Sequence, residues 1–424
     1  MKKILITVIF SAFVSTMINA QWEAAGPWPD SNYIGGSHGI AVDPDGKVWT
    51  SSYYFSNWAT PGGDTLKATP IFVFNADGTP ADTIYTVTDG TVTDSLTGKC
   101  RGLGTDEVGN IIYVQSGPAK GIKINYKTMA RMSSALLEEL GSSPTAPAVD
   151  ENGNIFIGPV VGGGTNAIAI YNTEFEYQGN AVVGPPAIAR TMEVSKDGNT
   201  IYWLPFTAQA GYVYSRNDEF SSYELTDSLF LGMSIESSAW QPVSNLLWVS
   251  HDVDRGTDST KSDLTWYGYD LTSKTFVDSF TLMEAVNAGD KYPRALDFSP
   301  DGKIAYVSLF GTKFHRIYKF TTDSVKVDIE EIPGTIPNGI ELAQNYPNPF
   351  NPSTSISFSI PKSDIVTLRV FDMLGQQVVE LLNEQKSAGN YKVTFDASKL
   401  ASGTYVYMLQ VGDVSISKKM LLLK

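Results

Sequence analysis

The sequence contains little cysteine, little histidine and few charged side chains. One cysteine and three histidines occur among 424 residues, and charged residues make up 18% of the chain. A single cysteine excludes a disulfide framework and any zinc site built from cysteines. Acidic residues outnumber basic residues by 45 to 31, which gives a formal charge of −14. This charge argues against nucleic-acid binding, because that function requires a basic surface.

Apolar and turn-forming residues are plentiful by comparison. Hydrophobic residues make up 42% and aromatic residues 12% of the chain, which also has 37 glycines. This composition is unlike that of a disordered chain and favours many short strands joined by tight turns. No phosphate-binding loop or dinucleotide-binding motif occurs. Residues 35–39 match G-x-S-x-G, but a strand pattern follows where a nucleophile elbow needs a helix.

The N-terminus has the pattern of a secretory signal peptide. Lys2 and Lys3 precede an apolar run over residues 4–14, and Ala20 ends a plausible cleavage site. The apolar run is shorter than the roughly 20 residues that a membrane-spanning helix needs. We therefore expect residues 1–20 to be a signal peptide and the mature chain to have no transmembrane segment. Loss of the two lysines changes the formal charge from −14 to −16.

Alternating residues near the C-terminus indicate a small β-sandwich. Ile356, Phe358 and Ile360 alternate with serines, and residues 366–370 repeat the alternation. Turn signals at 372–375 and 402–403 separate further strand patterns. Several short strands within about 85 residues are typical of a sandwich. We expect this domain to occupy residues 340–424.

The same region resembles the type A C-terminal sorting domain of the type IX secretion system. The resemblance rests on ordered motifs, which are NYPNPFNP at 345–352, VFD at 370–372, LG at 374–375, ASGTY at 401–405 and a basic-then-apolar tail at 418–424. It implies that the type IX machinery is a partner. It also implies export through the periplasm to a secreted or cell-surface location. In this family the sorting domain is often removed after export.

Between the two ends, a pattern repeats six times. Each copy has an apolar strand, a turn such as Asp43-Pro44-Asp45-Gly46, and a second strand. The turn residues are 46, 109, 153, 198, 244 and 302, and further strand patterns follow each pair. Four strands in each repeat of roughly 45 residues are typical of a β-propeller blade. We predict an all-β chain with a six-bladed propeller over 21–330, a linker over 331–339 that contains Pro and Gly, and then the β-sandwich.

One position of the repeat places six residues around the expected central channel. The first strand of each blade lines the channel, and the residue eight before the turn residue lies near its mouth. These residues are His38, Arg101, Thr145, Arg190, Glu236 and Arg294. Because arginine binds carboxylates and phosphates strongly, we predict that the three arginines and His38 bind a small anionic or polyhydroxylated ligand. The alternative is that the arginines form structural ion pairs with Glu193, Asp297 and Glu236.

Two long loops, each between the second and third strands of a blade, are expected on the same face of the propeller as the channel mouth. The first is aromatic, and its Tyr54 and Trp58 are candidates for stacking on a sugar or peptide, with packing across the propeller face as the alternative. The second places Asp252, Asp254 and Asp258 like the oxygen ligands of a calcium loop, but it lacks the terminal Glu of an EF-hand. Calcium is the one cofactor that we name as a candidate. The alternative is a solvated acidic loop.

Two functions fit these features. The first is a secreted or cell-surface module that binds a small molecule, a glycan or a surface partner at the channel mouth. The second is a lactonase- or lyase-like enzyme, because the repeat resembles the propellers of the NHL, gluconolactonase and streptogramin-lyase group. Members of the lyase-like group use a histidine and acidic residues at the channel mouth, which implies His38 as general base and Glu236 as acid or metal ligand. Resemblance of fold does not establish activity, so both functions stay open.

Overall fold

The computed structural model describes most of the two predicted domains. The described residues are 22–29, 37–60, 63–141, 143–252, 256–283, 286, 292–310, 317–322, 329–332, 337–373, 375, 377–397, 400, 402–412 and 414–423. The predicted signal peptide, Gly35 and Gly36 of the G-x-S-x-G match, and Asp254 of the predicted calcium loop lie outside the described residues.

Six four-stranded antiparallel sheets form the blades of a β-propeller, as predicted. The first three blades contain β2 (Ser37–Val42), β3 (Val48–Ser52), β6 (Ile71–Phe74) and β7 (Pro80–Ile84); β10 (Lys99–Thr105), β11 (Ile111–Ser116), β12 (Lys120–Ile124) and β13 (Arg131–Leu136); and β14 (Ala148–Val149), β15 (Ile155–Ile157), β16 (Ala167–Tyr171) and β17 (Tyr177–Val183). The last three contain β18 (Ala189–Val194), β19 (Thr200–Pro205), β20 (Gly211–Ser215) and β21 (Glu224–Leu229); β22 (Ser238–Trp240), β23 (Leu247–Ser250), β24 (Thr265–Asp270) and β25 (Thr275–Thr281); and β26 (Pro293–Phe298), β27 (Ile304–Leu309), β28 (Ile317–Thr322) and β1 (Trp22–Trp28).

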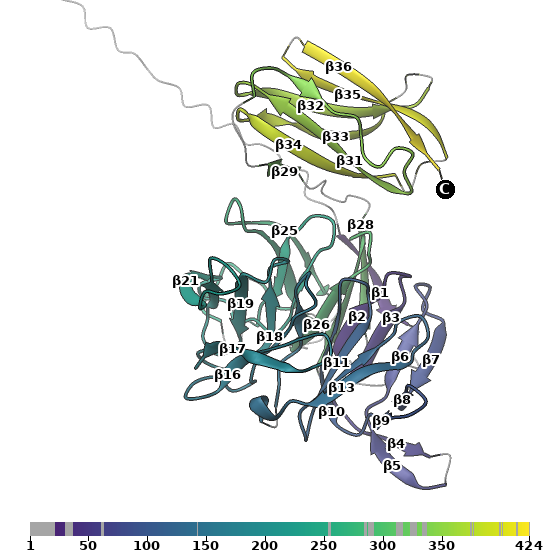
Figure 1. Cartoon of the computed structure of the whole chain (residues 1–424), viewed down its shortest axis with the longest axis vertical. Helices are drawn as coiled ribbons and strands as arrows, with labels where there is room; N and C mark the ends of the chain where they lie inside the picture. The colour runs from purple at the N-terminus through teal and green to yellow at the C-terminus, as the bar shows by residue number, and fades with distance from the viewer. Residues whose placement is uncertain are drawn as a thin grey trace, which may run out of the picture.

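The N-terminal strand closes the ring of blades. β1 pairs antiparallel with β28, so the sixth blade combines strands from both ends of the domain. Figure 1 shows purple β1 beside green β28. Trp28 of β1 also packs against Phe74 and Tyr306, with ring centroids 5.6 and 4.9 Å apart. Closure therefore uses backbone hydrogen bonds as well as packing between the first and sixth blades.

The turn between the first two strands contains a residue with positive φ in each of the six blades, which is glycine in five blades and asparagine in one. Gly46, Gly109, Gly153, Gly198 and Gly302 have φ angles between 67° and 90°. In the fifth blade the turn contains an extra residue, and Asn245, with φ 52°, takes this conformation instead of the predicted Ser244. Because the extra residue lies within the turn, the alignment of Glu236 with the other first strands is unchanged.

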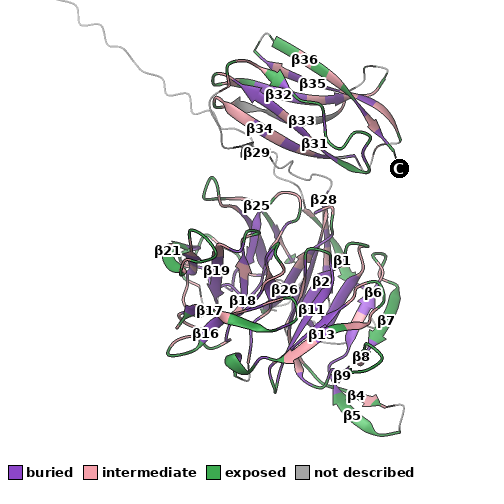
Figure 2. Cartoon of the chain, in the orientation of Figure 1, coloured by how far each residue is buried: buried purple, intermediate pink, exposed green. Residues whose placement is uncertain are grey.

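Burial falls from the central channel toward the outside of each blade. Figure 2 shows inner strands such as β2 and β11 in purple and outer strands such as β7 in green. Apolar side chains of neighbouring blades form shared clusters, for example Trp49 of the first blade with Tyr113 of the second. First strands approach closely, since a Cβ atom added to Gly102 would lie 2.5 Å from the Cα atom of Ala146. This approach explains why small residues follow the ring positions.

Two hairpins extend the first blade and the connection after it. β4 (Ser56–Ala59) and β5 (Thr65–Ala68) lie between β3 and β6, and β8 (Thr86–Thr88) and β9 (Thr93–Ser95) follow β7. They account for the long interval between the first two turn glycines. A short 3-10 helix, η1 (Glu138–Leu140), follows β13.

The C-terminal domain is the predicted β-sandwich. In the first sheet the strands lie in the order β29 (Ile329–Ile332), β34 (Gly389–Asp396), β31 (Ser353–Ile360) and β30 (Glu341–Leu342). In the second sheet the order is β33 (Gln377–Lys386), β32 (Asp364–Phe371), β35 (Gly403–Val411) and β36 (Val414–Leu422). Ile356, Leu368 and Tyr407 are among the buried residues of its core. β29 corrects the predicted boundaries, because it pairs with β34 and so places residues 329–332 in the sandwich sheet rather than at the end of the propeller and in the linker.

Candidate functional site

Four of the predicted ring residues lie at β-bulges. The register between the first and second strands shifts at these positions, which are His38, Arg101, Arg190 and Arg294. A bulge displaces one residue from the hydrogen-bonded ladder and re-aims its side chain. The recurring bulge therefore directs these side chains from the first strands into the channel mouth.

The structure brings these four side chains together around a cavity of about 40 Å³. Glu236 lies beside two of the arginines, and we call His38, Arg101, Arg190, Glu236 and Arg294 the cationic ring. Thr145, the remaining predicted position, uses its hydroxyl within its own blade, where it accepts a hydrogen bond from the backbone of Gly158 at 3.0 Å. Five of the six predicted ring residues thus form one cluster.

Glu236 is the carboxylate that two of the arginines share. It is 1% exposed, its Oε2 atom lies 3.0 Å from Nε of Arg190, and the same atom accepts a hydrogen bond from Arg294. The Arg190 contact is ionic, because its N–H group is not aligned with the oxygen. Part of the alternative prediction was therefore right, since Glu236 pairs with arginines. Glu193 and Asp297 make no such pairs within the described residues and face another part of the channel.

Arg101 differs from the other two arginines in its partners. It donates hydrogen bonds to the hydroxyls of Ser116 and Ser143, at 3.2 and 2.6 Å. No carboxylate pairs with it in the part of the chain that the structure describes. Burial lowers the pKa of Arg101; Tyr53 opposes this shift, and the nearby charge of Arg190 adds a smaller lowering effect. Two guanidinium groups thus lie close enough to repel each other.

Aromatic rings that the sequence did not identify hold the arginine side chains. The guanidinium carbon lies 4.3 Å from the Phe206 ring centroid for Arg190 and 4.6 Å from the Phe310 centroid for Arg294. That of Arg101 lies 5.2 Å from the Tyr53 ring. Cation–π contacts of this kind orient a guanidinium group without neutralising its charge. Tyr53, Phe206 and Phe310 occupy one repeat position, directly after the second strand of each of these three blades.

His38 is a neutral member of the ring. It is buried, and its Nδ1 atom has no hydrogen-bond partner among the described residues. Burial, followed by the charges of Arg294, Arg101 and Arg190, holds the pKa of His38 well below its usual value. With His38 neutral, three guanidinium groups face one carboxylate among the described residues. The ring therefore carries a net positive charge in a chain whose formal charge is −14.

The two predicted aromatic candidates have different positions. Tyr54 is 48% exposed and stacks on Phe310, with ring centroids 5.6 Å apart, so it lies at the edge of the cationic ring. Trp58 lies in the β4–β5 hairpin and stacks on Tyr85 at 5.3 Å. The structure thus gives Trp58 a packing contact of its own.

The predicted calcium ligands do not form a cluster in the described residues. Asp258 accepts hydrogen bonds from the backbone and hydroxyl of Thr260, which closes its own turn. Asp252 is buried, whereas Asp258 is half-buried. No group of three or more His, Cys, Asp or Glu side chains suited to a metal ion occurs among the described residues. Calcium binding at this loop stays a prediction.

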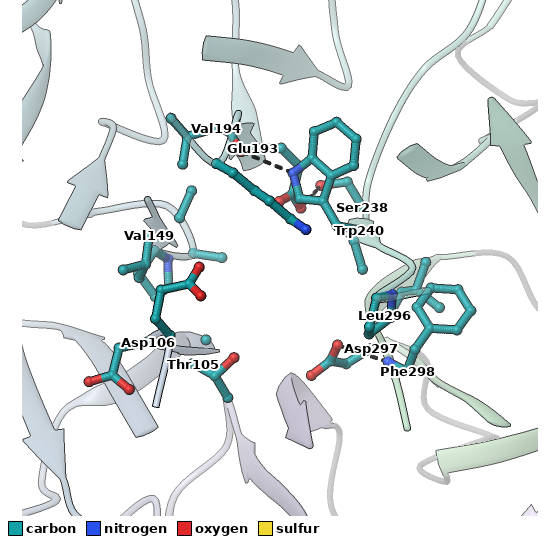
Figure 3. Close-up of a pocket in the computed structure, with 18 of the residues that line it drawn as sticks. Thr105, Asp106, Val149, Glu193, Val194, Ser238, Trp240, Leu296, Asp297 and Phe298 are labelled. Carbon is teal, nitrogen blue, oxygen red and sulfur yellow. Dashed lines mark hydrogen bonds between the residues drawn. The ribbon is translucent and has the colours of Figure 1, made fainter. Parts of the chain in front are cut away.

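The other half of the channel is a larger cavity of about 810 Å³. Ile40, Leu103 and Leu296 line both this cavity and the one at the ring, so they lie between the two. Glu193 and Asp297 lie on different walls of the larger cavity, with Trp240 near Glu193 (Figure 3). We call this half the acidic cavity.

Burial dominates the electrostatics of the two carboxyl groups in the acidic cavity. It raises the pKa of Glu193 to about 8, with a further contribution from the charge of Asp297. It raises the pKa of Asp297 to about 7, although the backbone N–H groups of Phe298 and Val42 donate to that carboxylate. The channel therefore has a cationic mouth at one end and partly protonated carboxyl groups in the other half.

A comparison with known families identifies the C-terminal domain. Residues 344–423 match the family model of the secretion system C-terminal sorting domain. This match confirms the resemblance found in the sequence, so the protein is a β-propeller that carries a type IX sorting domain and is secreted or displayed at the cell surface. No curated protein matches the chain. Among the described residues there is no helix of the length and apolar character needed to cross a membrane.

Several solved structures are similar to the chain at low identity. One is described as the extracellular domain of a hybrid two-component system from B. thetaiotaomicron, with 11% identity, a TM-score of 0.41 and coverage of 95% of this chain and 57% of that chain. The present chain therefore spans 57% of the length of that protein. A luciferin-regenerating enzyme has 9% identity, a TM-score of 0.48 and coverage of 71% and 96%. A calcium-binding regucalcin from Agrobacterium tumefaciens has 11% identity, a TM-score of 0.46 and coverage of 70% and 94%. These similarities assign no ligand or activity.

Proposed function

We propose that the propeller binds a small anion at the cationic ring. The observation that carries this proposal is the charge balance, since three guanidinium groups face one carboxylate. Like charges held together in a partly buried site are costly, and an anion between them removes that cost. Arg101 is the main candidate for the contact, because its partners within the described residues are neutral hydroxyls.

The arginines are oriented before any ligand arrives. Phe206 and Phe310 lie against Arg190 and Arg294, and Glu236 contacts both. A binding site whose side chains are already ordered loses less conformational entropy on binding. Each charge-assisted hydrogen bond to an anion contributes about 1.5–3 kcal/mol. This arrangement supports binding of a carboxylate or a small oxyanion.

Thermal unfolding of residues 21–424 with acetate, inorganic phosphate or glucose tests the proposal. An anion that binds the folded state raises the unfolding midpoint by mass action, whereas glucose has no charge for the ring to recognise. Arg101→Ala should remove most of the anion-dependent shift. Arg216→Ala is the matched control, because Arg216 also stacks on a tyrosine, Tyr223, but lies outside the ring. Equal shifts in the two variants, or no shift with either anion, would contradict the proposal.

The geometry gives little support to the lactonase- or lyase-like alternative. Glu236 contacts two arginines, and their charges oppose its protonation and hence its use as an acid. The lowered pKa of His38 makes it a weak general base. The net positive charge of the ring also opposes a metal ion bound by these two residues. We therefore propose binding rather than this reaction.

A further inference from the structure

We propose that the acidic cavity is a second binding site, which takes a small organic cation. The cavity occupies the half of the channel opposite the cationic ring, and its volume is about 810 Å³. The proposal does not depend on anion binding at the ring, because different residues carry it.

The first argument is the contacts of the two half-buried carboxyl groups of Glu193 and Asp297. Glu193 accepts a hydrogen bond from the hydroxyl of Ser238 through Oε1, at 2.7 Å, and within the described residues no hydrogen bond reaches its Oε2 atom. Asp297 accepts backbone hydrogen bonds from Val42 and Phe298, at 2.7 and 2.8 Å. Neither has a cationic side-chain partner in the described part of the chain. A carboxylate that is partly removed from water is stabilised by a nearby cation, so a cationic ligand would supply the charged partner that these two groups lack.

The charge around the cavity points to the same class of ligand. Six carboxyl groups and one ammonium group line it, from Asp106, Glu107, Glu151, Glu193, Asp197 and Asp297, and from Lys196. A cleft lined by charges of one sign raises the local concentration of ligands of the opposite sign. An anion or a second acidic molecule would be repelled from this half of the channel.

Size and chemistry favour an organic cation over a bare metal ion. Cavities that hold small organic molecules have volumes of about 300–1,000 Å³, and this cavity lies in that range. Trp240 lines it and is fixed by a hydrogen bond from its Nε1 atom to the carbonyl of Val194, at 3.1 Å. Tryptophan is the strongest side-chain partner for cation–π contacts with ammonium groups. The described residues also contain no cluster of three metal-ligating side chains.

A ligand has a route into the cavity. Glu107, Glu151, Asp197 and Lys196, which belong to the turns between first and second strands, line it and are exposed. The parts of Glu193 and Asp297 that remain accessible therefore face a cavity that opens at the turn end of the propeller. At the opposite end, Ile40, Leu103 and Leu296 separate the carboxyl groups from the cationic ring.

Isothermal titration calorimetry of residues 21–424 with putrescine and with tetramethylammonium at about pH 9, above the raised pKa values of Glu193 and Asp297, tests the inference. We expect saturable binding of at least one of these cations. Glu193→Gln should weaken it about tenfold or more, because a charge-assisted hydrogen bond is lost. Glutamine retains an oxygen that accepts the Ser238 hydroxyl, so this variant should fold, and its thermal unfolding checks that it does. Asp297→Asn should have a similar effect.

Two controls make the result specific to the acidic cavity. Glu224→Gln removes an exposed carboxylate on the outer strand β21, outside the channel, and should leave binding unchanged, and so should Arg101→Ala at the cationic ring. Absence of saturable binding with both cations would overturn the inference. Equal binding by the wild type and Glu193→Gln, or loss of binding in Arg101→Ala, would also overturn the inference. The same holds if CaCl₂ or glucose bound in this cavity and neither organic cation did. Anion binding at the ring is measured separately, so either site can fail without the other.

Discussion

Glu236 determines the charge balance of the cationic ring. One of its oxygens contacts both Arg190 and Arg294, so a single buried carboxylate holds two guanidinium groups from two other blades. Several carboxylates lay near the arginines in the repeat, and spacing alone did not distinguish among them. The structure separates them because Glu193 and Asp297 lie farther along the first strands and line the acidic cavity.

Glu236→Gln should destabilise the propeller strongly. The substitution leaves two partly buried arginines without their shared carboxylate, and breaking a buried ion pair from one side costs about 3–5 kcal/mol of unfolding free energy. Urea unfolding measures this change. Asp227→Asn is the control, since Asp227 pairs with Lys274 at the exposed surface and its loss should hardly move the midpoint. Similar midpoints for the two variants would show that the ring is not held together by Glu236.

At the scale of elements, β1 decides how the propeller closes. The sixth blade takes its outermost strand from the N-terminus, and the register runs from Trp22 opposite Thr322 to Trp28 opposite Ile317. A strand from one end of the domain thereby holds the other end in place. The two ends cannot separate without breaking this ladder and exposing Trp28.

Trp28→Ala should therefore weaken the closure. Trp28 is buried against Phe74 and Tyr306, and truncation of a buried Trp to Ala costs about 3–5 kcal/mol. Chemical denaturation followed by circular dichroism reports the loss. Phe220, which is 90% exposed, provides the control, since Phe220→Ala should leave stability nearly unchanged. A Trp28→Ala protein as stable as the control would mean that β1 contributes little to closure.

At the scale of the whole molecule, the channel makes stability depend on pH. The pKa of Glu193 is raised from 4.5 to about 8, and that of Asp297 from 3.8 to about 7. Folded-state pKa values above the unfolded values mean that both groups contribute most stability below their unfolded pKa values, and that this contribution is lost progressively as the pH rises to the folded values of about 7–8. The unfolding midpoint should therefore fall between about pH 6 and pH 8 and level off above that range.

The difference between the wild type and Glu193→Gln isolates this effect. His38 acts in the opposite direction, because its lowered pKa favours the folded state above its unfolded pKa of 6.5 and opposes it in acid. Glu193→Gln should reduce the fall between about pH 5 and pH 8, and the two curves should run parallel above that range. If the two proteins already lost stability in parallel from about pH 5 to pH 8, the carboxyl group of Glu193 would not be the source of the fall.

Export is the other property of the whole chain. The sorting domain directs passage across the outer membrane, so a chain that ends at residue 339 should remain in the periplasm. Cell fractionation with immunoblotting distinguishes the locations of the full-length and truncated proteins. Appearance of the truncated protein outside the cell at the full-length level would contradict the assignment of the sorting function to residues 340–424.

Local patterns were sufficient to predict the all-β class, the six blades and the sorting domain. Each depends on short-range chemistry, because alternation sets a strand, a glycine with positive φ sets a turn, and ordered motifs mark the sorting domain. The position of the ring residues was also predictable, since one register repeats in every blade. Residues 329–332 were misplaced because pairing with β34, more than 50 residues later, outweighs the local signal for a linker.

Only the tertiary structure decided which side chains interact across blades. The pairing of Glu236 with two arginines, the rings of Phe206 and Phe310 beneath them, and the separate acidic cavity all depend on contacts between distant parts of the chain. Charge and burial act through space, so a sequence position alone does not specify whether a carboxylate neutralises an arginine or faces a cavity. Although the chain is acidic overall, the fold therefore gathers basic side chains at the channel mouth and acidic side chains in the cavity behind it.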